Sequence, residues 1–352
     1  MQTSVCDRRF AFQNLKSANP ECKLKSATVG LHSANNMSQP QDLKIVFMGT
    51  PEFAVVSLQK LLDHKASVVG VVTGPDKPTG RGLQVQPPPV QQLARQAGLP
   101  ILQPDKLRES QFIQSLREWQ ADLFFVVAFR ILPPEVFTLP PLGTINVHAA
   151  LLPKYRGAAP IQWALINGER KTGVTTFFID EKMDTGEMIL QKPTAIGEFE
   201  TAGELHDRLA VLGADLLIET LELVANSKVQ RQSQTGAGSL APKITKEMAA
   251  IDWKKSAREI FNFIRGMNPV PGAFTTLQGR HLKIFRTHVV DESASGPAAG
   301  AIVQANVKTG ELIIQTGGGL LAIDELQIEG KRLMSAADFL RGHQIQTHEK
   351  LN

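Results

Sequence analysis

Short, continuous apolar runs alternate with amphipathic stretches from Lys44 onward, and this alternation constrains the fold more than any other feature. The runs read "KIVFMG", "SVVGVVTG" and "ADLFFVVAF", and they are separated by helix-like stretches such as "PEFAVVSLQKLLDH" and "SQFIQSLREWQ". Unbroken runs of Val, Ile and Phe are typical of strands that are buried on both faces of a parallel sheet. We therefore expect an open, mostly parallel α/β sheet of the Rossmann-like class, with its ligand beyond the carboxyl ends of the strands.

The second half of the chain follows a different pattern. Residues 228–242 contain Gly, Ser, Gln and Pro with little apolar periodicity, which is typical of a linker. Beyond them, a helix-like stretch at 257–267 precedes short strand-like runs over 274–330, and such runs favour a small antiparallel β-barrel of the OB-like kind. The predicted organisation is a leader over 1–41, an α/β domain over 42–227, a linker over 228–242 and a C-terminal β-barrel domain over 243–352.

The first 36 residues are rich in Ser, Asn, Gln and basic side chains but lack the apolar core of a secretory signal. We expect a disordered leader, or a segment that precedes the true start at Met37, and an organelle transit peptide is the alternative. No apolar run in the sequence approaches the roughly 18 residues that a membrane span requires. The prediction is a cytoplasmic protein.

Charge and cysteine content limit the kinds of site. The net charge is +4, and five basic and two acidic residues precede Met37, so the rest of the chain is almost balanced and nucleic-acid binding has to come from local patches. The two cysteines, Cys6 and Cys22, both lie in the leader, which leaves the body without a disulfide or a cysteine metal site. A lone Gly49 after the first strand does not form a dinucleotide fingerprint, so we expect no nucleotide cofactor.

Three polar residues stand at the ends of expected strands. Asn146 and His148 are two apart in "TINVHAA", so both side chains project from the same face, and Asp184 follows in "KMDTGEM" between the next two strands. An imidazole with a carboxylate partner and a neighbouring amide suits attack of an amine on a carbonyl-like carbon, and no motif places a Ser or Cys nucleophile. The alternative is a capped strand end with a buried histidine, in which Asp184 is only a turn residue.

The loop "TGPDKPTGRGLQVQPPPV", residues 73–90, carries Lys77 and Arg81 among Gly and Pro. It is longer than most loops between a strand and a helix, and loops of this length are more often functional. A basic loop that is short of acidic residues could reach a phosphate backbone. The alternative is a solvated loop without a partner.

Six ordered blocks carry a family resemblance: "KIVFMGTPEFAV", "GVVTGPDKPTGRG", "VVAFRILP", "INVHAALLPKYRGAAPIQWALINGE", "TGVTTFFIDEKMDTGEMI", and "APKITKEMAAIDW" with "IRGMNPVPGAFT". From about Leu43 to Arg341 the chain resembles the methionyl-tRNA formyltransferase family of 10-formyltetrahydrofolate-dependent transferases. The central two blocks are shared with other transferases that use this folate. The Arg81 loop and "APKITKE" are more particular to the tRNA enzymes.

The resemblance implies a reaction and a set of site residues. The α-amino group of the methionine on initiator Met-tRNA attacks the formyl carbon of 10-formyltetrahydrofolate, the formyl donor, without metal or nucleotide cofactor. Asn146 and protonated His148 stabilise the oxyanion, and Asp184 holds His148 and assists proton movement. The implied folate-binding residues are Phe129, Ile131, Leu132, Ala150, Leu151, Leu152 and Pro153, and the implied tRNA-binding residues are Lys77, Arg81, Lys243, Lys246 and Lys254. The family also implies a monomer with no membrane partner.

The chain departs from the family in two places. Ala150 stands where the family usually has Ser before Leu-Leu-Pro. Folate affinity is weaker if that hydroxyl contributes, and unchanged if only the backbone does. "GRGLQVQ" lacks the lysine pair that the family often has after Arg-Gly, so contact with the tRNA acceptor end depends more on Lys77 and Arg81. Nine basic and four acidic residues between 243 and 291 favour a positive strip on the barrel.

Two other functions fit the same residues. A formyltransferase that acts on a small amine, such as an amino sugar nucleotide or glycinamide ribonucleotide, needs Asn146, His148 and Asp184 but not the basic loop and barrel. A folate- or tRNA-binding protein without turnover has no need of a charged pair beside the formyl group. Salt-sensitive affinity for tRNA would distinguish the tRNA enzyme from a small-amine formyltransferase. Turnover would distinguish either enzyme from a binding protein.

Overall fold

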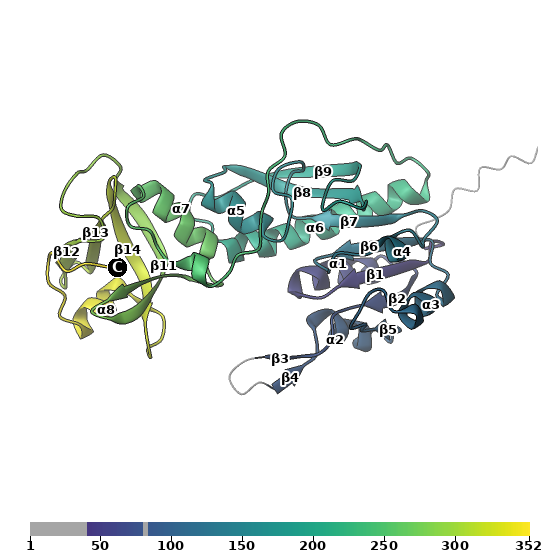
Figure 1. Cartoon of the computed structure of the whole chain (residues 1–352), viewed down its shortest axis with the longest axis horizontal. Helices are drawn as coiled ribbons and strands as arrows, with labels where there is room; N and C mark the ends of the chain where they lie inside the picture. Colours follow the sequence, from purple (N-terminus) through teal and green to yellow (C-terminus); the bar gives the residue numbers. More distant parts are fainter. Residues whose placement is uncertain (1–40, 80–83) are drawn as a thin grey trace, which may run out of the picture. The chain divides into compact units, whose positions relative to one another are not determined.

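The computed structural model, which describes residues 41–79 and 84–352, contains a seven-stranded sheet with the order β5-β2-β1-β6-β7-β8-β9 (Figure 1). Its strands are β1 (Ile45–Gly49), β2 (Val68–Val72), β5 (Ile101–Leu102), β6 (Leu123–Val127), β7 (Thr144–His148), β8 (Lys171–Phe178) and β9 (Met188–Ala195). The first five strands in this order pair in parallel, whereas β8 is antiparallel to β7 and to β9. The expected mostly parallel sheet is confirmed, with an antiparallel edge.

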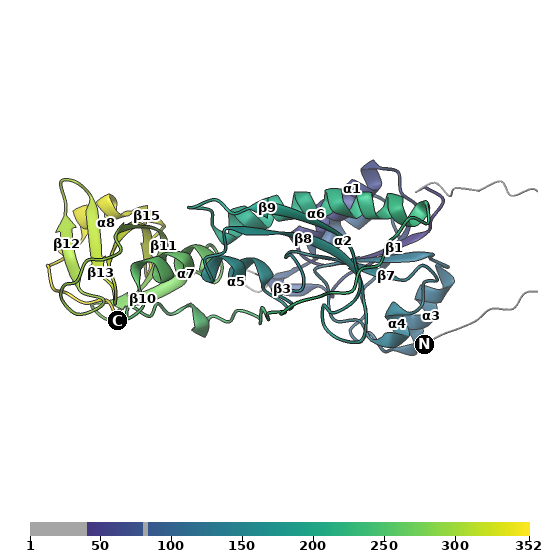
Figure 2. The ribbon, with the colours of Figure 1, turned by 90° about the horizontal axis from the view of Figure 1, so that it is seen from above.

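Helices cover both faces of this sheet, because alternate side chains of a strand point to opposite faces. In β1, Ile45 and Phe47 pack with residues of α1, α2, α5 and α6, whereas Val46 and Met48 pack with residues of α3 and α4. Figure 2 shows α6 lying along β8 and β9 and beside α1. The helices are α1 (Glu52–Asp63), α2 (Pro89–Gln96), α3 (Ser110–Glu118), α4 (Pro134–Phe137), α5 (Pro160–Ile166) and α6 (Ala202–Ala225). None of the described helices has the length and apolarity that a membrane crossing needs.

The part from residue 243 onward has its own apolar core and a six-stranded antiparallel sheet, with the order β10-β11-β14-β13-β12 and β15 paired to β14. Its elements are η1 (Glu247–Ala249), α7 (Ala257–Met267), β10 (Ala273–Leu277), β11 (Arg280–Asp291), β12 (Ile302–Asn306), β13 (Glu311–Gln315), β14 (Leu320–Ile328), β15 (Met334–Ser335) and α8 (Ala336–Gly342). Gly279, Gly310 and Gly319 turn the chain between strands at positive φ. This sheet is compatible with the expected small barrel, while the sequence pattern does not predict β15 and α8.

The prediction of a plain loop over 73–90 is wrong. Within it, β3 (Lys77–Thr79) pairs antiparallel with β4 (Gln84–Gln86) as a hairpin. The Gly and Pro signals dominate this stretch, and two three-residue strands are too short to show a periodicity. Arg81 lies outside the described residues, as do the predicted leader up to residue 40 and its two cysteines.

Candidate active site

Strand β7 brings two of the predicted catalytic residues to one face of the sheet. Ile145 and Val147 point into the core beneath α1 and α6, so Asn146 and His148 lie on the opposite face, at the carboxyl end of the strand. Asn146 is half-buried, and His148 is 6% exposed. Because β6 and β8 pair with β7 on either side, the backbone that carries both side chains is fixed.

The imidazole of His148 has a hydrogen-bond partner at one nitrogen and a nearby carboxylate at the other. Its Nε2 lies 2.8 Å from the backbone oxygen of Tyr155, and because a carbonyl oxygen only accepts, Nε2 must donate. Its Nδ1 lies 3.8 Å from Oδ2 of Asp184, which is close enough for electrostatic attraction but too long for a direct hydrogen bond. Phe177 meets the ring edge-on, with 6.4 Å between ring centres. Nδ1 is therefore the nitrogen left to exchange a proton or to meet a substrate.

Asp184 lies in the loop between β8 and β9 at a φ of +54°, a left-handed conformation that Asp adopts more readily than most residues. Its Oδ2 accepts a hydrogen bond of 2.7 Å from the backbone N–H of Gly157, and the same oxygen faces His148. The side chain of Asp184 is 14% exposed. The residue thus occupies a turn, as one sequence hypothesis expects, and also presents its carboxylate to the imidazole, as the other expects.

This arrangement suits direct attack of an amine on a carbonyl-like carbon. The amide of Asn146 is of the kind that donates to a developing oxyanion, and an imidazole beside a carboxylate can carry a proton between reacting atoms. Within residues 41–79 and 84–352, no group of three or more His, Cys, Asp or Glu side chains is placed to hold a metal ion.

The segment from Tyr155 to Gly157 supplies partner atoms to both His148 and Asp184, and its only sequence signal is the Arg-Gly pair of "KYRG". Gly157 has a φ of +124°, and a Cβ there would lie 2.6 Å from the backbone oxygen of Ala241, so the position requires glycine. The Tyr155 side chain is buried. Burial is the main cause that raises the pKa of Tyr155 to about 12.

The side chain of Ala150 is fully buried and belongs to a small apolar cluster with Tyr155, Ala164 and Ala241. A serine hydroxyl at position 150 would lie in this cluster. Whether the missing hydroxyl changes folate affinity stays a prediction.

The rest of the predicted Leu-Leu-Pro segment is held by side chains of the two antiparallel strands. The backbone N–H of Leu152 donates to Oγ1 of Thr175 on β8 (3.2 Å), and its backbone oxygen accepts from Nε2 of Gln191 on β9 (2.8 Å). Leu151 and Pro153 are half-buried, while Leu152 is 3% exposed. Sequence reasoning missed Thr175 and Gln191, because they lie on strands that follow the segment in the chain.

The other predicted folate segment, after β6, has side chains in three environments. Ile131 is 75% exposed, Phe129 is half-buried, and Leu132 is 5% exposed in the core with α4. Arg130 donates to the backbone oxygens of Pro104 (2.7 Å) and Asp105 (2.9 Å). Leu132 therefore offers a ligand only its backbone, since its side chain faces the core.

The predicted tRNA-binding lysines are all exposed. Lys77 lies on β3, and Lys243, Lys246 and Lys254 lie between the linker and α7, on either side of η1. Exposure suits contacts with phosphate, but it is equally typical of solvated lysines. Their role in tRNA binding stays a prediction.

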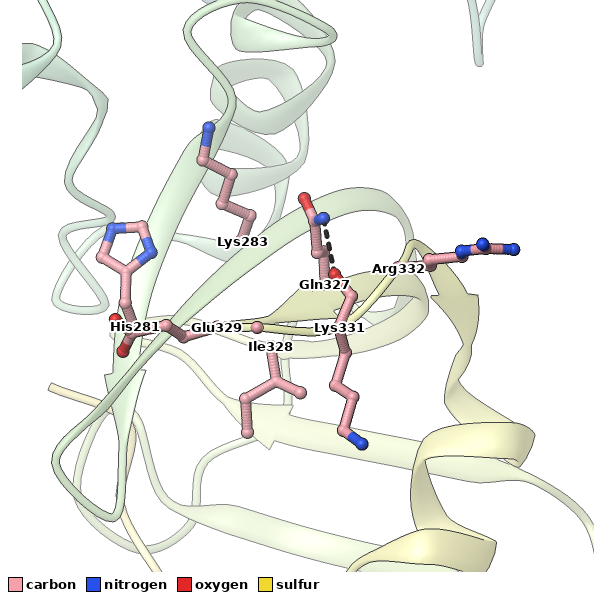
Figure 3. Close-up of a pocket in the computed structure, with 8 residues that line it drawn as sticks. His281, Lys283, Gln327, Ile328, Glu329, Lys331 and Arg332 are labelled. Atoms are coloured by element: carbon pink, nitrogen blue, oxygen red, sulfur yellow. Dashed lines mark hydrogen bonds between the residues drawn. The ribbon is translucent and has the colours of Figure 1, made fainter. Parts of the chain in front are cut away.

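A pocket of about 580 Å³ lies on the C-terminal sheet (Figure 3). His281 and Lys283 of β11 line it together with Lys331 and Arg332 of the turn after β14, and Glu329 is the acidic residue of the lining. Sequence reasoning missed Lys331 and Arg332, because strand pairing brings this turn to β11 from far along the chain.

Comparisons with known proteins identify the family. The formyl transferase model matches residues 43–221, and the model of the formyl transferase C-terminal domain matches residues 243–344. The methionyl-tRNA formyltransferase of Pelotomaculum thermopropionicum is 50% identical over 301 residues, which cover 85% of this chain and 96% of the relative. That of Geotalea daltonii is 47% identical over 312 residues, covering 88% and 98%.

The fold is also similar to that of solved structures. An N-formyltransferase from Helicobacter canadensis, solved in complex with folinic acid and dTDP-3-aminofucose, matches with a TM-score of 0.59 and 21% identity. The match covers 80% of this chain and 98% of that one. At this identity the likeness concerns the fold alone. Taken with the matches over both parts of the sequence, it leaves one conclusion: the chain belongs to the formyl transferase family, among the methionyl-tRNA formyltransferases.

Proposed function

We propose that the protein transfers the formyl group of 10-formyltetrahydrofolate to the α-amino group of the methionine on initiator Met-tRNA, which gives formylmethionyl-tRNA for translation initiation. The observation that carries this proposal is the grouping of Asn146, His148 and Asp184 at the carboxyl end of β7, in a chain 50% identical to a methionyl-tRNA formyltransferase. Attack of an amine on a formyl carbon needs an oxyanion donor and a proton carrier, and these side chains supply both.

The three residues have distinct roles in the transfer. The amine nitrogen forms a bond to the formyl carbon, the bond from that carbon to N10 of the folate breaks, the amine loses a proton, and N10 gains one. Asn146 donates to the oxygen that becomes negative in the tetrahedral intermediate. His148 meets the reacting atoms through Nδ1, since Nε2 is engaged by Tyr155, and Asp184 stabilises the charged ring. A preorganised oxyanion donor is typically worth about 3–4 kcal/mol in the transition state.

The donor folate is proposed to bind along the segments 129–132 and 150–153. Two hydrogen bonds support this assignment, because they hold the second segment against β8 and β9: the Leu152 N–H donates to Thr175, and Gln191 donates to the Leu152 oxygen. Backbone groups rather than side chains of Ala150 and Leu132 would then contact the ligand, since both side chains are buried.

The tRNA is proposed to contact exposed basic residues of the hairpin and of the C-terminal domain. Lys77, Lys243, Lys246 and Lys254 are exposed, and the pocket on the C-terminal sheet adds Lys331 and Arg332 to the residues that the sequence suggests, while the role of Arg81 rests on sequence alone. Contacts between such cations and phosphates give affinity that falls as salt rises. We also propose that the protein is a monomer in the cytoplasm.

Labelled formyl transfer tests the proposal. The purified protein is incubated with labelled 10-formyltetrahydrofolate and, in parallel, initiator Met-tRNA, elongator Met-tRNA, free methionine and an amino sugar nucleotide. We expect label in the initiator tRNA only, and its loss in His148→Ala. Label in the amino sugar nucleotide instead would favour the small-amine formyltransferase, and label in no acceptor would favour a binding protein.

A further inference from the structure

The linker segment, residues 228–242, is bound against the candidate active site. The Oγ of Ser239 accepts from the backbone N–H of Tyr155 (2.9 Å), and the backbone oxygen of Ser239 accepts from the N–H of Arg156 (2.9 Å). The N–H of Ala241 donates to the oxygen of Arg156 (2.7 Å). The backbone that supplies partners to His148 and Asp184 is thus paired to the linker rather than to a strand of the sheet.

Gln234 occupies the centre of this contact. Its Nε2 donates to the backbone oxygens of Asp184 and Gly186, at 2.9 Å each. Its Oε1 accepts from Nε and one terminal nitrogen of Arg156, at 3.1 and 2.6 Å. One half-buried amide therefore joins the loop of Asp184 to the segment that contains Tyr155.

We propose that Gln234 is a positioning residue that sets the distance between the imidazole of His148 and the carboxylate of Asp184, a role that rests on the formyl transfer proposed above. The imidazole is held by the oxygen of Tyr155, and the carboxylate is held by the N–H of Gly157. Both anchors belong to the segment that Arg156 ties to Gln234. No direct hydrogen bond joins Nδ1 of His148 to Oδ2 of Asp184, which lie 3.8 Å apart. This distance therefore depends on how the backbone of the Tyr155 segment and the backbone of the Asp184 loop are held relative to each other.

Steady-state formyl transfer by variants of the full chain tests the role. Gln234→Ala removes both halves of the link, and Gln234→Glu keeps an acceptor for Arg156 but turns an oxygen toward the two carbonyls of Asp184 and Gly186. We expect kcat to fall at least about tenfold in both variants, with KM for Met-tRNA and for the folate within about twofold of the unmodified protein. Gln230→Ala, an exposed linker glutamine, is the matched control and should leave kcat unchanged.

A double-variant comparison separates positioning from general support. If Gln234 acts through Asp184, Gln234→Ala should lower kcat by less than about twofold in an Asp184→Ala background, because the effects of coupled residues are not additive. An unchanged kcat in Gln234→Ala would overturn the positioning role while leaving the formyl transfer intact. A loss of equal size in both backgrounds, or a fall in Tm that accounts for the lost activity, would also overturn it. Absence of transfer by the unmodified protein would overturn the proposed function, and the role of Gln234 with it.

Discussion

The carboxyl end of β7 and the pocket on the C-terminal sheet present polar side chains in opposite ways. At β7, His148 and Asp184 are buried or nearly so, and each has a partner atom on the segment from Tyr155 to Gly157. On the C-terminal sheet, Lys331 and Arg332 are exposed at the edge of a pocket. In the proposed function, the first region holds a few atoms for the chemistry, whereas the second offers positive charge to the tRNA.

The difference predicts which measured quantity each region controls. Loss of a fixed donor at β7 removes an interaction of the transition state and should lower kcat. Loss of an exposed cation removes a phosphate contact and should raise KM for the tRNA, and lower its salt dependence. The comparison would be wrong if variants at β7 changed mainly KM for the tRNA, or if variants on the C-terminal sheet changed mainly kcat.

Apart from changes to His148 itself, the largest effect is expected for Asn146→Ala. This change removes the proposed oxyanion donor from a half-buried position without disturbing the core side chains on either side of it. We expect kcat to fall by about 100- to 1000-fold, equivalent to roughly 3–4 kcal/mol, with the Tm almost unchanged. Steady-state transfer to initiator Met-tRNA, with circular dichroism as the control for folding, measures both. A kcat within about threefold of the unmodified protein would remove Asn146 from the mechanism.

Gly157→Ala should damage the β7 region through its backbone. The added Cβ would lie 2.6 Å from the oxygen of Ala241, at a φ of +124° that side chains rarely adopt. We expect a loss of about 2–3 kcal/mol in the free energy of unfolding, together with lower kcat as the N–H that holds Asp184 shifts. Urea denaturation measures the free energy of unfolding. Gly236→Ala, also at positive φ but with no atom within 4 Å of the added Cβ, separates crowding from backbone strain. Equal losses in both would contradict crowding as the cause.

The buried Tyr155 makes the free energy of unfolding depend on pH. Its pKa is raised from the ordinary value of 10.0 to about 12 in the folded protein, chiefly by burial. Above pH 10 the unfolded chain loses a proton that the folded chain retains, so the free energy of unfolding should fall as pH rises from 10 to 12. Denaturation between pH 9 and 12 should show this fall in the unmodified protein and a shallower one in Tyr155→Phe, whereas identical slopes would contradict it.

The smallest effects are expected on the C-terminal sheet. Lys331→Ala and Arg332→Ala should each raise KM for Met-tRNA by about three- to tenfold near physiological salt and reduce the slope of log affinity against log salt by about 1, with kcat unchanged. Lys308→Ala, an exposed lysine between β12 and β13, serves as the control. A change in kcat without a change in the salt slope would argue that these cations do not meet phosphate.

Sequence patterns predict the sheet and its helices well, because each is long enough to show its own periodicity. The stretch at 257–267 is α7 to the residue, and the unbroken runs become β1, β2 and β6. The hairpin of β3 and β4 and the short β15 escape prediction, since two or three residues carry no period.

The candidate site is predictable only in part. Spacing places Asn146 and His148 on one face, because both belong to one strand, but nothing local indicates that Tyr155 and Gln234 support them. Composition marks residues 228–242 as a linker, whereas its hydrogen bonds to the β7 region depend on tertiary packing. Likewise, Lys331 and Arg332 join Lys283 only through the pairing of β14 with β11.

The rate of formyl transfer in a single turnover, with Met-tRNA saturating and at low and high salt, tests the division between the two regions most directly. In His148→Ala we expect the rate to fall by at least about 1000-fold at both salt concentrations, while tRNA affinity keeps the salt slope of the unmodified protein. A rate within about threefold of that of the unmodified protein would contradict the assignment of the chemistry to the carboxyl end of β7. So would a loss of activity that appears only below saturating Met-tRNA.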